Sequence, residues 1–268
     1  MERKRTEIVL GCYPKHEIFG VTALNKSMKE KVEQYLEETK GYSPQEILQF
    51  AYKTFGERLK FATSLGEEDQ VLTDMIAKVE PRICIFSLDT GRLFQETYDL
   101  LSKTQKRYPM KIEVYYPDTQ AVEEMVQKKG INLFYESVEN RKTCCGIRKV
   151  EPLQRALKDT DAWITGVRRA QSVTRAVMKT FEWDEANQKI KINPLADWSL
   201  EQVKEYVADH NLDVNPLHAQ GFISIGCAPC TRAVQEGEDI RAGRWWWEAP
   251  EQKECGLHNN PRRPKKED

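Results

Sequence analysis

The chain has no surplus of charge of either sign. Among its 268 residues, 41 Lys and Arg stand against 42 Asp and Glu, which leaves a net charge of −1. Without an excess of positive charge, no overall field attracts nucleic acid or an anionic membrane, and we expect neither as a partner. An anionic ligand must therefore be met by a local group of basic side chains.

The sequence also lacks long apolar runs and a clear export signal. No run approaches the ~18 apolar residues that a membrane-spanning helix requires. The basic N-terminus is followed by only a short apolar stretch before Pro14, Lys15 and His16, which is a poor secretory signal. Since free thiols last best in a reducing compartment, we expect a cytoplasmic protein.

Short apolar runs alternate with longer amphipathic ones through the middle of the chain. Strands are predicted at residues 59–64, 83–88, 111–115 and 162–165, and helices at 69–79, 93–107, 121–129 and around 147–158. Strands separated by helical patterns of this length are typical of parallel sheets with crossover helices. The predicted fold class is α/β, with a doubly wound, mostly parallel sheet.

The flanking segments differ from this core. Residues 27–56 predict two helices separated at 41–44, where Ser43 can cap and Pro44 can open the second helix. A small hairpin is expected at 181–184 and 189–192, and a capped helix at 199–210. Periodicity is lost from Gly226 onward. We therefore predict an N-terminal helical segment at 1–56 packed on the domain, an α/β core at 57–225, and a C-terminal segment with a mobile arm at 226–268.

Two turns follow neighbouring predicted strands and have the composition of ligand-binding loops. Residues 63–69 place Ser64 and Gly66 between a strand and a helix, where backbone N–H groups and the helix dipole bind phosphate or sulfate. An ordinary capped helix start, with acidic residues complementing the dipole, explains this turn equally well. Residues 87–92 form a second such turn, and the carboxyl edge of an open α/β sheet is where ligands bind.

A group of cationic residues could complete an anion pocket beside these turns. Forked guanidinium groups suit phosphate and sulfate oxygens, although any one such residue is more often a solvated surface charge. The candidates are Lys149, Arg168, Arg169, Arg175, Arg241 and Arg244.

Five of the seven cysteines form two pairs and one isolated position. The pairs are Cys144 with Cys145 and Cys227 with Cys230, and Cys255 stands alone. Four thiolates can hold a tetrahedral zinc or an iron–sulfur cluster. Directly adjacent cysteines fit poorly on one zinc, so a [4Fe–4S] cluster is favoured. The remaining alternative is that the pairs are buried small hydrophobes or a chance grouping.

Seven ordered segments, at residues 64–69, 87–92, 144–149, 166–172, 227–230, 244–248 and 254–258, carry a resemblance to a known family. Together they resemble the assimilatory adenylyl-sulfate reductases. These are thioredoxin-dependent enzymes related to phosphoadenylyl-sulfate reductases and, more distantly, to ATP pyrophosphatases. The resemblance covers residues 61–258 and implies an adenine nucleotide alpha-hydrolase-like fold. It also implies that the core at 57–225 binds the nucleotide and that residues 226–268 hold a cluster-binding segment and a catalytic arm.

The resemblance also implies a chemistry. It assigns a [4Fe–4S] cluster to Cys144, Cys145, Cys227 and Cys230, and a nucleophile to Cys255, which would accept the sulfonate of adenosine 5′-phosphosulfate as an S-sulfocysteine. Thioredoxin or glutaredoxin would then release sulfite. With the two turns, it gives a substrate-binding set of Ser64, Gly66, Leu88, Thr90, Lys149, Gly166, Arg175, Arg241, Arg244 and His258.

The sequence departs from its relatives at three positions. In the Ser-Gly-Gly-x-Asp-Ser loop of the pyrophosphatases, Leu65 replaces a glycine and Asp69 replaces the last serine. A carboxylate there would repel a pyrophosphate, which argues against ATP cleavage. Arg141 stands where some cluster-bearing relatives have a histidine, so local anion contacts are expected to differ.

Three other functions stay open from the sequence. The first is the same reaction on 3′-phosphoadenylyl sulfate. The second is a sulfur-inserting ATP pyrophosphatase, which the neutral charge and Asp69 disfavour. The third is a zinc-stabilised interaction module. Residues 245–247, three tryptophans, either latch the arm and dock thioredoxin or pack on the core. A homo-oligomer is possible.

Overall fold

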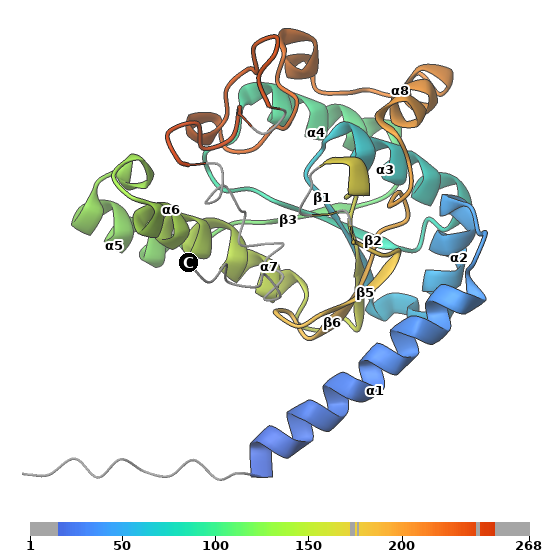
Figure 1. Cartoon of the computed structure of the whole chain (residues 1–268). Helices are drawn as coiled ribbons and strands as arrows, with labels where there is room; N and C mark the ends of the chain where they lie inside the picture. The colour runs from blue at the N-terminus through green and yellow to red at the C-terminus, as the bar shows by residue number, and fades with distance from the viewer. Residues whose placement is uncertain (1–15, 172–174, 176, 240–241, 250–268) are drawn as a thin grey trace, which may run out of the picture.

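A computed structural model describes residues 16–171, 175, 177–239 and 242–249, with side chains from residue 27 onward (Figure 1). In this part of the chain, six strands form one sheet in the order β3-β2-β1-β4-β6-β5. The strands are β1 Leu59–Thr63, β2 Cys84–Leu88, β3 Ile112–Tyr115, β4 Ala162–Ile164, β5 Phe181–Asp184 and β6 Lys189–Ile192. All neighbours are parallel except β5, which pairs antiparallel with β6. The predicted fold class and hairpin are confirmed.

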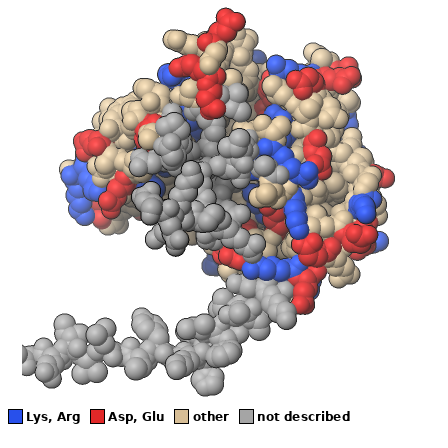
Figure 2. Space-filling model, in the orientation of Figure 1, with Lys and Arg blue, Asp and Glu red and all other residues tan. Residues whose placement is uncertain are grey.

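Helices cover both faces of the sheet (Figure 1). They are α1 His16–Glu38, α2 Pro44–Phe55, α3 Glu67–Val79, α4 Gln95–Arg107, α5 Thr119–Lys129, α6 Val138–Cys145, α7 Glu151–Ala156 and α8 Leu200–Asp209. None of the described helices is long and apolar enough to cross a bilayer. Basic and acidic side chains are interspersed over the face shown in Figure 2, as the balanced composition predicts.

Local sequence explains where the helices start. Ser43 and Glu46 form a capping box at α2, with the Ser43 N–H donating to Glu46 Oε2 at 2.7 Å and the Glu46 N–H donating to Ser43 Oγ at 3.3 Å. Ser199 and Gln202 repeat this arrangement at α8. Both helix starts that the sequence predicts from a serine cap are confirmed.

The larger core lies between the sheet and the helices α2, α3 and α8. Alternate residues of β1, including Leu59 and Phe61, are fully buried there against Val71, Leu72 and Met75 of α3. The Tyr35 ring of α1 packs on Phe181 of β5, with ring centroids 5.7 Å apart. These contacts join the N-terminal helices to the sheet. The boundaries predicted at 56/57 and 225/226 stay predictions.

The opposite face carries a smaller core under α7, in which Phe86 and Trp163 contact Leu153. The helix predicted around residues 147–158 differs from the structure, because helical backbone begins at Val138 and continues through α6 and a π-helical turn, Gly146–Val150, into α7. The early start is missed because α6 has few apolar residues and so no apolar period. The adjacent cysteines consequently lie in the last turn of a helix.

Candidate active site at the carboxyl edge of the sheet

In the turn after β1, Leu65 adopts a backbone conformation that is typical of glycine. Leu65 has a φ of 63°, in the left-handed region that favours glycine. Its side chain is only 2% exposed, and its N–H donates to Thr63 Oγ1 at 3.1 Å. Burial of the leucine side chain offsets the cost of this conformation. The replacement of a glycine by Leu65 therefore changes the composition of the turn and keeps its left-handed backbone.

Asp69 fills the position where an anion would bind this turn. Its Oδ2 accepts from the Ser64 N–H at 2.6 Å and from Ser64 Oγ at 2.7 Å. Burial raises the pKa of Asp69 to about 6, although the bonds from Ser64 and from the Gly166 N–H oppose this shift. The donors that would receive a phosphate are thus occupied by the carboxylate of the same loop.

Gly166, which follows β4, packs directly against the Asp69 carboxylate. A Cβ at Gly166 would fall well inside contact distance of Asp69 Oδ1. At Gly66, the N-cap of α3, a Cβ would meet Ser64 Oγ at an ordinary 3.5 Å. Sterically, glycine is therefore required at Gly166 and not at Gly66.

Two of the candidate cations are committed to protein partners. Arg168 is buried and contacts Glu68 with Nε at 2.9 Å and Nη2 at 2.8 Å. Arg169 donates to the Met178 carbonyl at 2.6 Å and pairs with Asp197. Both guanidinium groups hold the loop after β4 in place, so the interpretation of Arg168 and Arg169 as ligand-binding cations is not supported by these contacts.

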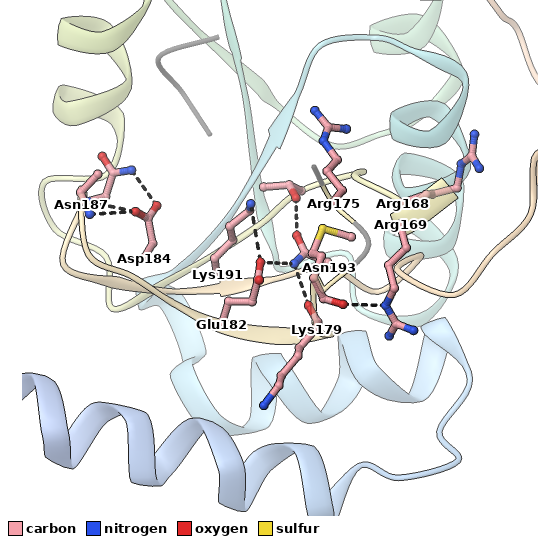
Figure 3. Close-up of polar contacts among 12 residues, drawn as sticks. Arg168, Arg169, Arg175, Lys179, Glu182, Asp184, Asn187, Lys191 and Asn193 are labelled. Atoms are coloured by element: carbon pink, nitrogen blue, oxygen red, sulfur yellow. Dashed lines mark hydrogen bonds and ion pairs between the residues drawn. The ribbon is translucent and has the colours of Figure 1, made fainter. Parts of the chain in front are cut away.

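Arg175 lies near Lys191, a partly buried lysine on the β5–β6 hairpin. Figure 3 shows the side chains of Arg175 and Lys191 pointing to the same side of the hairpin. Lys191 Nζ is 3.8 Å from Glu182, and Asn193 donates to Glu182 at 3.0 Å. Burial lowers the pKa of Lys191, the Glu182 and Asp184 carboxylates oppose this shift, and Arg175 adds to it. Two cations thus lie close together beside the edge of the sheet.

The turn after β2 joins the sheet edge to the second cysteine pair. Asp89 Oδ1 accepts from the Gly91 N–H at 2.7 Å, which shapes the turn. The Thr90 hydroxyl lies 3.2 Å from Cys227 Sγ, and its carbonyl accepts from Arg148 Nη1 at 2.6 Å. Thr90 therefore contacts both the C-x-x-C segment and the π-helical turn that follows the adjacent pair.

All four paired cysteines line one pocket. Cys144 and Cys145 end α6, while Cys227 and Cys230 flank and end η7, Ala228–Cys230. The other lining residues are Arg92, Phe134, Arg141, Arg148, Lys149 and Pro229. None of the described cysteines forms a disulfide. Among the residues that the structure describes, no three Cys, His, Asp or Glu side chains converge closely enough to hold a single metal ion.

The chemistry of this pocket suits a metal–sulfur group. Burial raises the pKa of Cys230 to about 12, the other pocket cysteines add to the shift, and Arg244 opposes it. Burial likewise raises the pKa of Cys144, against the effect of Arg148. Neutral thiols are therefore favoured in the empty protein, and a bound metal would convert them to thiolates. Soft sulfur donors of this kind select zinc, copper(I) or iron–sulfur clusters.

The segment after η7 returns to the pocket. The Trp245 N–H donates to the Cys230 carbonyl at 3.2 Å, and Thr231 and Arg244 form an antiparallel bridge. A Cβ at Gly226 would lie 2.6 Å from Arg244 Nη2, so this guanidinium rests against the residue preceding Cys227. Arg244 is thus held beside the cysteine pocket.

The tryptophans pack on the protein. Trp245 is buried, and Trp247 Nε1 donates to the Phe134 carbonyl at 3.1 Å. Trp246 is 39% exposed and lies 6.1 Å from the Tyr135 ring. Of the two interpretations left open by the sequence, packing applies to Trp245 and Trp247.

The predicted site residues fall into two adjoining groups. Because β1 and β2 run in parallel with Thr63 beside Ser87, their following turns lie together at one edge. The first group surrounds Asp69 and consists of Ser64, Gly66 and Gly166, with Arg175 beside the hairpin. The second group surrounds the cysteine pocket and consists of Thr90, Lys149, Arg244 and the four cysteines. Leu88, at the end of β2, lies between the two groups. Cys255, Arg241 and His258 lie outside the described residues.

Comparison with known proteins identifies the family. Residues 58–233 match the phosphoadenosine phosphosulfate reductase domain. The chain is 54% identical over 207 residues to the adenosine 5′-phosphosulfate reductase of Allochromatium vinosum, covering 76% of this chain and 81% of that protein. The chain belongs to the phosphoadenosine phosphosulfate reductase family. The family predicted from the seven sequence segments is confirmed.

Solved structures agree with this family. The phosphoadenylyl-sulfate reductase from Candida auris, in a phosphate complex, aligns with a TM-score of 0.67 and 33% identity, covering 76% of this chain and 97% of that one. FMN adenylyltransferase from Candida glabrata, with FMN and an ATP analogue, aligns with a TM-score of 0.50 and 15% identity, covering 76% and 70%. The second likeness shows the fold alone, which is adenine nucleotide alpha-hydrolase-like, as expected.

Sequence reasoning missed several residues at the site. Arg92 and Arg148 line the cysteine pocket, and Lys191 lies in the hairpin. Arg92 and Arg148 lie within the segments 87–92 and 144–149 that carry the family resemblance. Their place in these segments was a usable signal that they belong to the site. Lys191 gave no such signal, since the alternation of lysine and isoleucine along β6 is typical of a strand with one solvated face.

Proposed function

We propose that the protein reduces adenosine 5′-phosphosulfate to sulfite and AMP in sulfate assimilation, using thioredoxin or glutaredoxin. The observation that carries this proposal is the pocket of four cysteines beside the two turns, in a chain 54% identical to an adenosine 5′-phosphosulfate reductase. The Asp69 carboxylate in the first turn supports it further, because it occupies the donors that ATP cleavage would need. The thiols favour a cytoplasmic location.

Cys144, Cys145, Cys227 and Cys230 would hold a [4Fe–4S] cluster. Four soft donors from two segments, with Arg92, Arg148 and Lys149 around the same pocket, fit a group whose thiolate ligands make it anionic. When bound, the cluster would link α6 to η7 and place its charge beside Lys149. No electron needs to pass through it, since thiols supply both electrons.

Cys255 would carry the covalent step. Its thiolate attacks the sulfur of adenosine 5′-phosphosulfate, the bond from sulfur to the bridging oxygen breaks, and AMP leaves with the electron pair. The product is an S-sulfocysteine. A thioredoxin thiolate then attacks Cys255 Sγ, sulfite leaves, and the second thioredoxin cysteine resolves the mixed disulfide. Cys255 returns as a thiolate, and thioredoxin is oxidised.

Basic residues would make the attack of one anion on another possible. Lys149 and Arg244, which lie at or beside the pocket, would offset the charge of the sulfonate. Arg241 is a further candidate, and His258 would favour the Cys255 thiolate. Gly66, Leu88, Thr90, Gly166 and Arg175 would contact the nucleotide. Ser64, whose N–H and hydroxyl both donate to Asp69, would contact it as an acceptor through Oγ.

Substitution of the proposed nucleophile tests the reaction. Cys255→Ser should abolish sulfite formation while iron content and AMP binding stay at wild-type levels. Cys84→Ser is the matched control, since Cys84 lies on β2 beside Glu113 and away from the cysteine pocket. Mass spectrometry of the wild type mixed with substrate alone should find a sulfonate adduct on the peptide containing Cys255. Substantial turnover by Cys255→Ser would refute the assignment.

Two further measurements separate the alternatives. Equal amounts of iron and acid-labile sulfide in the purified protein would support the cluster, whereas stoichiometric zinc would refute it. The kcat/KM for adenosine 5′-phosphosulfate should exceed the kcat/KM for 3′-phosphoadenylyl sulfate. The higher identity to a reductase of the first nucleotide, 54% against 33%, favours this order.

A further inference from the structure

A buried ion pair joins two segments that are far apart in the sequence. Arg141 donates to Glu248 through Nε at 2.9 Å and Nη2 at 2.8 Å, and the side chains are 1% and 2% exposed. Removing two charges from water is costly, and only well-aligned bidentate geometry offsets that cost. The pair therefore holds its two segments in one fixed relation.

Each partner lies next to a part of the site. Arg141 precedes Cys144 by three residues on α6, which places both on one side of the helix. Glu248 lies at the end of residues 244–248, which we term the arm root. The Glu248 N–H donates to the Trp245 carbonyl at 2.9 Å, so the acidic residue closes a turn around Trp245.

Trp245 connects the ion pair to Arg244. The guanidinium carbons of Arg141 and Arg244 lie 4.6 Å and 4.7 Å from the centroid of the Trp245 rings. The same indole packs with Cys144 and Cys230 in one apolar cluster. The position of Arg244 therefore depends on the docking of Trp245 against α6.

We propose that the Arg141–Glu248 pair positions the reacting groups, by holding Arg244 at the cysteine pocket and by fixing the point from which Cys255 is tethered. The inference deepens the proposed function and rests on it. Arg141 and Glu248 are positioning residues here, because neither needs to contact the substrate.

Chain length gives the size of the effect. Cys255 follows Glu248 by seven residues, so its Cα stays within about 25 Å of an anchored Glu248. With the arm root undocked, the last fixed point would be Val234, whose N–H donates to the Gly221 carbonyl at 2.9 Å. Val234 lies twenty-one residues before Cys255. The effective concentration of a tethered group falls roughly as the −3/2 power of tether length, so lengthening the tether from seven to twenty-one residues predicts a loss of about 5-fold. Displacement of Arg244 would add to this loss.

Two variants test the proposal. Glu248→Gln keeps the shape of the side chain but leaves Arg141 charged and buried, whereas Arg141→Met with Glu248→Gln removes both charges. The control is Glu151→Gln, which breaks an exposed ion pair with Arg155 on α7. The rate of AMP release from adenosine 5′-phosphosulfate is measured in a single turnover without thioredoxin, together with AMP affinity, iron content and near-ultraviolet circular dichroism.

We expect the rate of AMP release to fall at least 5-fold in both ion-pair variants and less than 2-fold in the control, with AMP affinity and iron content unchanged. The tryptophan dichroism should change in the ion-pair variants alone, and this readout does not depend on activity. Arg141→Lys, which keeps the positive charge, should retain part of the wild-type rate of AMP release. An unchanged rate in the double variant, or loss of iron in both variants, would overturn the proposal. Absence of AMP release by the wild type would instead refute the proposed function.

Discussion

At the scale of single residues, the contact between Gly166 and Asp69 controls the first turn. Asp69 is buried and bonded to both donors of Ser64, so moving its carboxylate aside would break both hydrogen bonds. Gly166→Ala would drive a methyl group into that carboxylate. We expect a loss of stability of about 2–3 kcal/mol, in the range of overpacked cores, and AMP binding at least 10-fold weaker.

Chemical denaturation and calorimetry check this expectation. The control is Gly146→Ala, because a Cβ there meets no atom within 4 Å and the backbone is helical. That substitution should leave stability unchanged or raise it by a few tenths of a kcal/mol. If Gly166→Ala behaved like Gly146→Ala, the close approach of the β4 turn to α3 would be wrong.

The raised pKa of Asp69 predicts a pH dependence. In the folded protein the carboxyl titrates at about 6, against 3.8 in its ordinary state. Between about pH 4 and 6 the folded state therefore binds more protons than the unfolded chain, and the contribution of Asp69 to stability falls as pH rises. The free energy of unfolding of wild type minus that of Asp69→Asn should decrease from pH 4.5 to 6.5 and level off above pH 7. Urea titrations at each pH measure it, and a pH-independent difference would contradict the assignment.

At the scale of elements, the helices and strands that the sequence predicts are those with a regular spacing of apolar residues. The strands and the helices α3, α4 and α5 were predicted because alternating or helical apolar patterns mark them. α6 carries residues 138–145 with little apolar content, so its start was missed, although Ser137 at its N-cap was a usable signal. The pairing of Arg141 with Glu248 could not be predicted, since no local pattern links residues 107 positions apart.

The cap of α6 gives a test at this scale. Ser137 Oγ accepts from the Asn140 N–H at 3.1 Å, and Ser137→Ala should cost about 1 kcal/mol of stability. Because Cys144 and Cys145 end the same helix, the iron of the proposed cluster should also be lost faster to a chelator. Ser43→Ala, at the cap of α2, should cost a similar free energy without changing iron retention. Equal rates of iron loss in the two variants would show that the α6 cap does not stabilise the cysteine pocket.

At the scale of the whole molecule, the parallel sheet assembles the site. The ends of β1, β2 and β4 meet at one edge, so Ser64, Thr90 and Gly166 come together from distant parts of the chain. This convergence follows from the topology and was predictable once the strands were. The filling of the first turn by Asp69 was not, because it depends on side-chain packing. The roles of Cys255, Arg241 and His258 stay predictions.

Removal of the proposed iron–sulfur cluster should loosen one part of the protein alone. The larger core is built from apolar residues of α2, α3, α8 and the sheet, and the cysteine pocket belongs to a separate cluster with Phe134 and Trp245. After treatment with a chelator, hydrogen exchange should accelerate in residues 138–150 and 227–247. Strands β1, β2 and β4 should keep their protection. Faster exchange throughout the sheet would contradict the independence of the two cores.

The separation of the two cysteine pairs along the chain has a consequence for biosynthesis. Cys144 and Cys145 are synthesised before β4, the β5–β6 hairpin and α8, and Cys227 and Cys230 come only after them. The nascent chain thus carries only half of the proposed ligand set while these elements are made. Loading of the proposed cluster would then be a late step on an already folded sheet, and a cell starved of iron would accumulate an inactive precursor that can be rescued without new translation.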